Sequence, residues 1–205
     1  MSIINRRQLL IAAVATGAAA AVTGCSHSTP RAAPPRSTSS ATTAARPADD
    51  TRTAVYVAGL EVLALSAYGQ MVELVNAGKV PPPAPAFGAL IDAARAQHQA
   101  HLDSWNAALV KAGHGQITQP DPGLVNTLGP IIQKVISIGV GQAALSLEQL
   151  VAANYVTVTS SFSSSENVRL AGSVEVVEMQ HVAAALYLLN MPPFPNAFAH
   201  DALSQ

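Results

Sequence analysis

The chain has 205 residues, of which 49% are apolar, 11% charged and 4% aromatic, and its formal net charge is -1 at pH 7. This length and apolar content suffice for one domain with a hydrophobic core, and the near-neutral balance excludes the basic surface that nucleic-acid binding needs. The charged fraction is far below the ~25% of average globular proteins, so a charge inside an apolar stretch is informative.

Residues 1–24 are predicted to be an export signal. Arg6 and Arg7 precede an apolar stretch and small residues that end at Cys25. The paired arginines resemble a twin-arginine signal, and "VTGC" at 22–25 resembles a bacterial lipobox, whose cysteine is lipidated and becomes the first mature residue. The alternative is an uncleaved membrane anchor, but the apolar run is near or below the ~20 residues that a spanning helix needs.

Cys25 is the only cysteine, which excludes an intrachain disulfide and favours lipidation. We therefore expect an exported protein whose lipidated Cys25 anchors it to the outer face of the cell membrane. Residues 25–50 are rich in Ser, Thr, Pro and Ala, which cannot bury enough apolar surface to fold, so they predict a flexible tether. The predicted bundle domain then spans residues 51–191, and residues 192–205 form a tail.

The domain predicts helices and no convincing strand alternation. The first helix is expected over residues 51–77, where Gly78 ends it and "VPPPAP" forms the connection. The second helix is expected over residues 85–112 and ends before Gly113. Both helices carry an apolar stripe at helical spacing, which indicates one face buried in a core.

The second half of the domain predicts a crossover and two more helices. Ser163 and Glu166 have capping-box spacing and open the last helix, which ends before a Pro-Pro pair. One helix over all of the preceding region would be roughly 60 Å long, against ~40 Å for its partners. Glycines and a proline offer breaks, so residues 114–139 are read as a crossover with its own short helix, and residues 140–162 as the third bundle helix. The expected fold is an all-α four-helix bundle with one long connection between helices 2 and 3.

Every predicted helix has a carboxylate or imidazole near the middle of its apolar stripe. These residues are Glu61, His98, His101, Glu148, Glu178 and His181. The pairs 98/101 and 178/181 are three residues apart, so each pair lies on one helical face and converges on one point inside a bundle. The two halves also repeat, because "LEVLALSAY" at 60–68 aligns with "LEQLVAANY" at 147–155, and "HQAH" aligns with "EMQH".

This duplicated pattern resembles the ferritin-like superfamily, nearest to exported ferritin-like domain proteins of bacteria. In that family one Glu from each of two helices and a Glu-x-x-His pair from each of the other two hold two metal ions. The resemblance implies that Glu61, Glu148, Glu178, His101 and His181 are metal ligands. It implies iron first, while carboxylate oxygens and imidazole nitrogens also suit manganese, zinc or copper.

His98 departs from the family pattern, because it stands where the family has a Glu that bridges the two metals. An imidazole ordinarily binds only one ion. We therefore expect either a single ion or an unequal pair, in which the half built on Glu148, Glu178 and His181 binds more tightly than the half built on Glu61, His98 and His101. Buried Glu–His ion pairs without metal are the alternative.

Tyr68 and Tyr155 each lie seven residues after a stripe Glu, on the same helical face. They are interpreted either as hydrogen-bond partners of the ligands or as core aromatics. The function predicted is a lipid-anchored, metal-binding ferritin-like protein with iron oxidation or peroxide chemistry. The alternative is a non-catalytic bundle of the cell envelope, a binding or scaffolding module with a degenerate metal site. The sequence leaves catalysis, a dimer and protein partners open.

Overall fold

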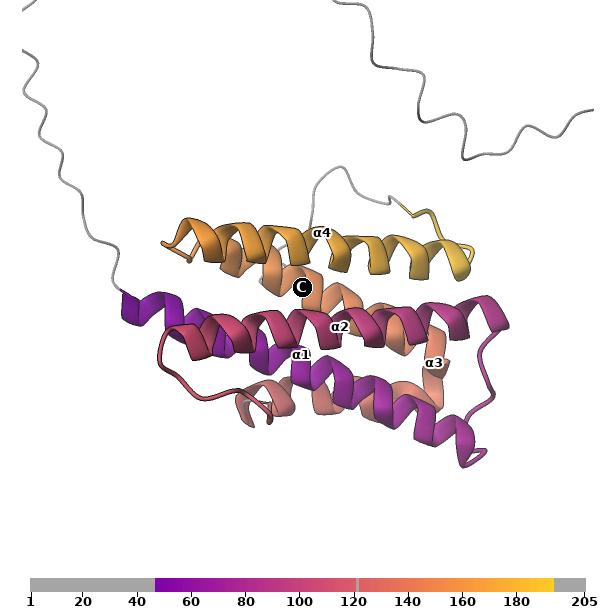
Figure 1. The fold of residues 1–205 in the computed structure, drawn as a ribbon. Coiled ribbons are helices and arrows are strands. Elements are labelled where there is room, and N and C mark those ends of the chain that lie inside the picture. The colour runs from indigo at the N-terminus through magenta and orange to yellow at the C-terminus, as the bar shows by residue number, and fades with distance from the viewer. Residues whose placement is uncertain (1–46, 121, 194–205) are drawn as a thin grey trace, which may run out of the picture. The chain divides into compact units, whose positions relative to one another are not determined.

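The computed structural model describes residues 47–120 and 122–193. They form four helices, α1 (Pro47–Asn76), α2 (Pro85–Lys111), α3 (Pro122–Thr159) and α4 (Ser165–Leu188). Figure 1 shows these helices packed as a bundle, in which α1 and α4 each pack against both α2 and α3. The all-α bundle prediction is confirmed. The predicted signal, the lipidation site Cys25, most of the tether and nearly all of the tail lie outside the described residues.

The crossover between α2 and the last part of α3 has the short helical piece that the sequence predicted. Gly139 interrupts α3 with φ 80° and ψ 160°, a backbone conformation essentially restricted to glycine. The piece before it spans residues 122–138, and the bundle helix after it runs to Thr159, three residues short of the predicted end. The change of direction within α3 is visible in Figure 1.

The start of α4 differs from the predicted capping box. Ser164, not Ser163, is the N-cap, and its side chain accepts from the backbone N–H of Asn167 at 3.4 Å. The N–H groups of Ser163 and Ser164 donate to the buried carboxylate of Asp50, at 2.7 and 2.8 Å. Asp50 lies in the first turn of α1, which begins four residues before the expected helix start. The carboxylate of Asp50 on α1 therefore accepts the N–H groups at the start of α4 in place of the predicted capping box of Ser163 and Glu166.

Among the described residues, α1 is long and apolar enough to cross a membrane by length and composition, since a window of 18 residues within Asp50–Asn76 has a mean hydropathy of 1.4. Its most apolar window is 56% buried inside the bundle. The helix also places the carboxylate of Glu61 in the core, fully buried. These are the properties of a core helix.

The core around the middle of the bundle is apolar, with a few large aromatic side chains. Tyr68, Trp105 and Tyr155 are each at most 1% exposed, and the Trp105 ring stacks on Phe162 with centroids 5.2 Å apart. The remaining buried side chains are mostly Ala, Val and Leu. Such surroundings make any buried carboxylate or imidazole costly unless it has partners.

Candidate metal centre

The structure brings all six predicted site residues together at the middle of the bundle. Glu61 comes from α1, His98 and His101 from α2, Glu148 from α3, and Glu178 and His181 from α4. All six are buried except His101, whose side chain is 11% exposed and is the member nearest to solvent. Their atoms form two groups that could each hold an ion.

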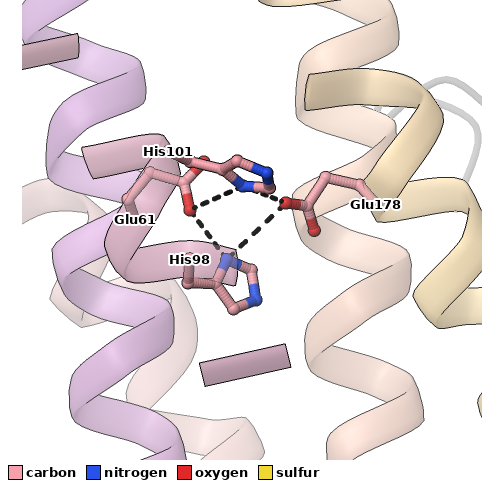
Figure 2. Close-up of side chains that lie close together, drawn as sticks. All are labelled: Glu61, His98, His101 and Glu178. Carbon is pink, nitrogen blue, oxygen red and sulfur yellow. Dashed lines mark hydrogen bonds and ion pairs between the residues drawn. The ribbon is translucent and has the colours of Figure 1, made fainter. Parts of the chain in front are cut away.

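The first group, called the Glu61 group here, consists of Glu61, His98, His101 and Glu178 (Figure 2). His98 Nδ1 lies 2.7 Å from Glu61 Oε2 and 3.6 Å from Glu178 Oε1. His101 Nδ1 lies 3.0 Å from Glu178 Oε1 and 3.7 Å from Glu61 Oε2. Two carboxylates and two imidazoles therefore converge, with one ligand atom from each within 4.8 Å of the others.

The second group, called the Glu148 group, consists of His98, Glu148, Glu178 and His181. His98 Nε2 lies 3.3 Å from Glu148 Oε1. His181 Nδ1 lies 3.1 Å from Glu148 Oε2 and 3.5 Å from Glu178 Oε2. This group has the same donor composition as the first, and the two share His98 and Glu178.

Both tyrosines contact the cluster, but each reaches the opposite helix. Tyr68 on α1 donates its hydroxyl hydrogen to Glu148 Oε1 on α3. Tyr155 on α3 donates to Glu61 Oε1 on α1, and Trp105 Nε1–H donates to the Tyr155 oxygen at 2.8 Å. These bonds fix the orientation of both carboxylates, as outer partners of metal ligands commonly do.

Gln97 is a further contact, which the sequence did not indicate. Its Oε1 accepts a hydrogen bond from His181 Nε2–H at 2.5 Å. Because the outer nitrogen carries that hydrogen, Nδ1 of His181 is the nitrogen that faces Glu148 and Glu178. The sequence could have indicated this contact only through the position of Gln97 next to His98, because nothing else distinguishes it from other exposed polar residues on α2.

The buried charges of the cluster stabilise one another. Burial alone would raise the pKa of the Glu148 carboxyl, but the charge of His98 and the hydrogen bond from His181 lower it overall. Burial alone would lower the pKa of each histidine, but the neighbouring carboxylates raise it for His98 and His101, and raise the pKa of His181 to about 9. Without metal, cationic imidazoles therefore neutralise anionic carboxylates.

Glu178 provides the test of whether a metal fits. Both of its oxygens and His101 Nδ1 are buried without a hydrogen bond, even though His101 Nδ1 and Glu178 Oε1 are only 3.0 Å apart. A buried carboxylate with no hydrogen bond is costly, and a cation bound between the two groups would satisfy it. Carboxylate oxygens with imidazole nitrogens suit iron, manganese, zinc and copper. The residues present therefore fit one or two metal ions.

Comparison with known proteins agrees with this geometry. Residues 49–191, more than half of the chain, match the family model described as "Ferritin-like domain". Neither a search of curated proteins nor a search of solved structures found a match to the chain.

Proposed function

Because the chain belongs to the ferritin-like domain family, we propose that it binds one or two transition-metal ions through the six-residue cluster. The observation that carries the proposal is the pair of Glu178 oxygens, which are buried between the two groups and lack a hydrogen bond. No other carboxylate among the described residues has both oxygens buried without a hydrogen bond. The three imidazoles contact these oxygens only as ion pairs at 3.0 to 3.6 Å, and a bound cation would give the oxygens a direct ligand bond.

Iron is the first candidate, because of the family, and ferrous iron oxidation or peroxide chemistry is the proposed activity. Bound iron would supply one-electron chemistry toward dioxygen or peroxide. The chain contributes binding and orientation, since Tyr68 and Tyr155 hold the carboxylates of Glu148 and Glu61. The apolar core keeps bulk water away from the cluster, and His101, which is 11% exposed, is its member nearest to solvent.

A second candidate function is a non-catalytic bundle that needs no metal. The observation that favours it is His98, which lies 2.7 Å from Glu61 and 3.3 Å from Glu148 and can neutralise both carboxylates as a cation. The protein would then serve as a binding or scaffolding module with a degenerate metal site. A metal-free cluster leaves the two buried Glu178 oxygens without a hydrogen bond, and for this reason metal binding is the stronger proposal.

Titration of the metal-free full chain with zinc or ferrous iron, followed by calorimetry and native mass spectrometry, distinguishes the two candidates. We expect the wild type to bind at least one ion, and Glu178→Gln to weaken binding by about 100-fold or more, beyond the 10–100-fold typical of outer partners. Glu175→Gln is the matched control, since Glu175 lies on the same helix outside both groups. Equal affinity of wild type and Glu178→Gln, or no binding by either, would support the metal-free bundle.

We further propose that the protein is exported and anchored by lipid to the outer face of the cell membrane. The support is the sequence alone, namely Arg6 and Arg7 ahead of the apolar stretch and "VTGC" at its end. A twin-arginine route suits a metalloprotein, because it carries proteins that fold and load metal before export. Stable anchoring takes more than one acyl chain, as a lipidated N-terminal cysteine would provide.

A further inference from the structure

His98 is the one imidazole whose two ring nitrogens both face the cluster. Its Nδ1 lies 2.7 Å from Glu61 Oε2 and 3.6 Å from Glu178 Oε1, in the Glu61 group. Its Nε2 lies 3.3 Å from Glu148 Oε1, in the Glu148 group. The ring is fully buried, so neither nitrogen reaches solvent.

The other two histidines do not share this arrangement. His181 directs only Nδ1 into the cluster, because its Nε2–H is bonded to Gln97. His101 likewise contacts both of its carboxylate neighbours through Nδ1, and its side chain is partly exposed. Glu178 parallels His98, because Oε1 faces His98 and His101 while Oε2 faces His181. His98 and Glu178 therefore each offer one atom to each group.

We propose that His98 binds two metal ions at once, as an imidazolate that bridges the Glu61 group and the Glu148 group. This inference rests on the metal-binding function proposed above and specifies its mode. Without metal, His98 is a cation and carries a hydrogen on each ring nitrogen. Each of the two ions replaces one of these hydrogens, and both hydrogens leave as protons to solvent, as metal binding to protonated ligands requires. The bridge that family members make with a carboxylate is here made by a ring.

Charge balance favours the bridging ring. The carboxylates of Glu61, Glu148 and Glu178 contribute three negative charges, and neutral His101 and His181 contribute none. An imidazolate at His98 adds a fourth, so two divalent ions leave the buried site with no net charge. With a neutral His98, two divalent ions would leave one uncompensated positive charge in an apolar core, which is costly.

A bridging imidazole ring also favours metals that bind nitrogen ligands over metals that prefer oxygen ligands. Imidazole nitrogen suits zinc, copper, iron and nickel, whereas manganese prefers oxygen ligands. Each ion would have two imidazole nitrogens and two carboxylates available within its group. Divalent iron, zinc, copper and nickel are therefore the ions that we expect to form the bridged pair, in place of the single or unequal occupancy expected from the sequence.

Cadmium-113 NMR of the full chain with nitrogen-15-labelled histidine tests the bridge directly. In the wild type we expect two cadmium signals per chain, with scalar coupling from His98 Nδ1 to one cadmium and from His98 Nε2 to the other. His98→Glu identifies these signals, because it keeps a carboxylate bridge and should retain two cadmium ions without the doubly coupled ring.

The outcomes separate this inference from the proposed function. Coupling of the two His98 nitrogens to two different cadmium ions establishes the bridge. Bound cadmium with coupling to one His98 nitrogen, or to neither, overturns the bridge and leaves metal binding intact. Absence of bound cadmium overturns both. The wild-type spectrum decides between these results even if His98→Glu does not fold.

Discussion

Raising the pH of the metal-free protein above about 6.5 should destabilise it, because the cluster holds His181 as a cation. His181 Nδ1 lies 3.1 Å from Glu148 Oε2 and 3.5 Å from Glu178 Oε2, while Nε2–H is bonded to Gln97. These carboxylates raise the pKa of His181 to about 9, against burial, which lowers it. The folded state therefore binds the proton more tightly than the unfolded chain, whose histidines have a pKa of about 6.5.

The size of the effect follows from the two pKa values of His181. A folded pKa of about 9 against about 6.5 unfolded is worth about 3 kcal/mol of stability. This contribution is fully present below the unfolded value and is lost as the pH rises through about 9. His98 and His101, whose pKa values are also raised, add to the loss in the same direction.

Urea unfolding of chelator-treated protein at several pH values between about 6 and 9.5 measures this loss, since the free energy of unfolding should fall across that window. His181→Gln should flatten the pH dependence, and His114→Gln, an exposed residue outside the cluster, should not. Protein saturated with zinc should show a smaller loss or the opposite trend, because protons compete with the metal. A free energy of unfolding that is constant or rises from pH 6.5 to 9 in metal-free wild type would show that the folded cluster does not hold His181 as a cation.

Three other perturbations test separate parts of the structure. Asp50→Ala removes the acceptor of two N–H groups at the start of α4 and should cost about 2–3 kcal/mol in urea unfolding, with unchanged zinc affinity. Gly139→Ala puts a side chain on a backbone conformation that only glycine adopts readily, and it should lower the free energy of unfolding by about 1–3 kcal/mol. Gly88→Ala, a helical position on α2 with open space around the added Cβ, should raise the free energy of unfolding by about 0.5–1 kcal/mol. Equal effects of the two substitutions would contradict the kink at Gly139. Cys25→Ala should release the protein from the membrane fraction, and an unmodified Cys25 in the intact mass of mature wild type would disprove lipidation.

The bundle could be predicted because its helix breaks are local in the sequence. Gly78 and Gly113 both have positive φ just beyond the ends of α1 and α2, and Gly139 interrupts α3. Four of the cluster residues could be predicted because the three-residue spacing of 98/101 and 178/181 fixes a common helical face whatever the tertiary structure. Glu61 and Glu148 could be predicted because each lies within an apolar stripe of the repeated halves. The pairing of atoms from different helices could not be derived from the sequence.

The tyrosines illustrate this limit. Seven residues along a helix is about 10 Å, too far for Tyr68 or Tyr155 to bond the Glu on its own helix. The reciprocal contacts, Tyr68 to Glu148 and Tyr155 to Glu61, show that α1 and α3 run antiparallel here, and this brings each tyrosine beside the other helix's Glu. The contact of Asp50 with the start of α4 could not be predicted either, because it also joins two different helices and 113 positions separate Asp50 from Ser163.

The orientation of the His98 ring likewise could not be derived from the sequence. The sequence showed that an imidazole stands where the family has a carboxylate, and the expectation of a single ion or an unequal pair stays a prediction. In the structure the ring nitrogens face different groups, at 2.7 Å from Glu61 and 3.3 Å from Glu148. Which way a buried ring points depends on packing around it, including Tyr68, whose ring lies 5.9 Å from that of His98.

Elemental analysis of the protein purified from its native compartment without added metal tests whether the cluster binds metal. We expect one or two equivalents of a transition metal per chain, retained through gel filtration and lost from Glu178→Gln but not from Glu175→Gln. Wild-type protein that carries no transition metal while remaining folded, or the same metal content in Glu178→Gln as in wild type, would contradict it.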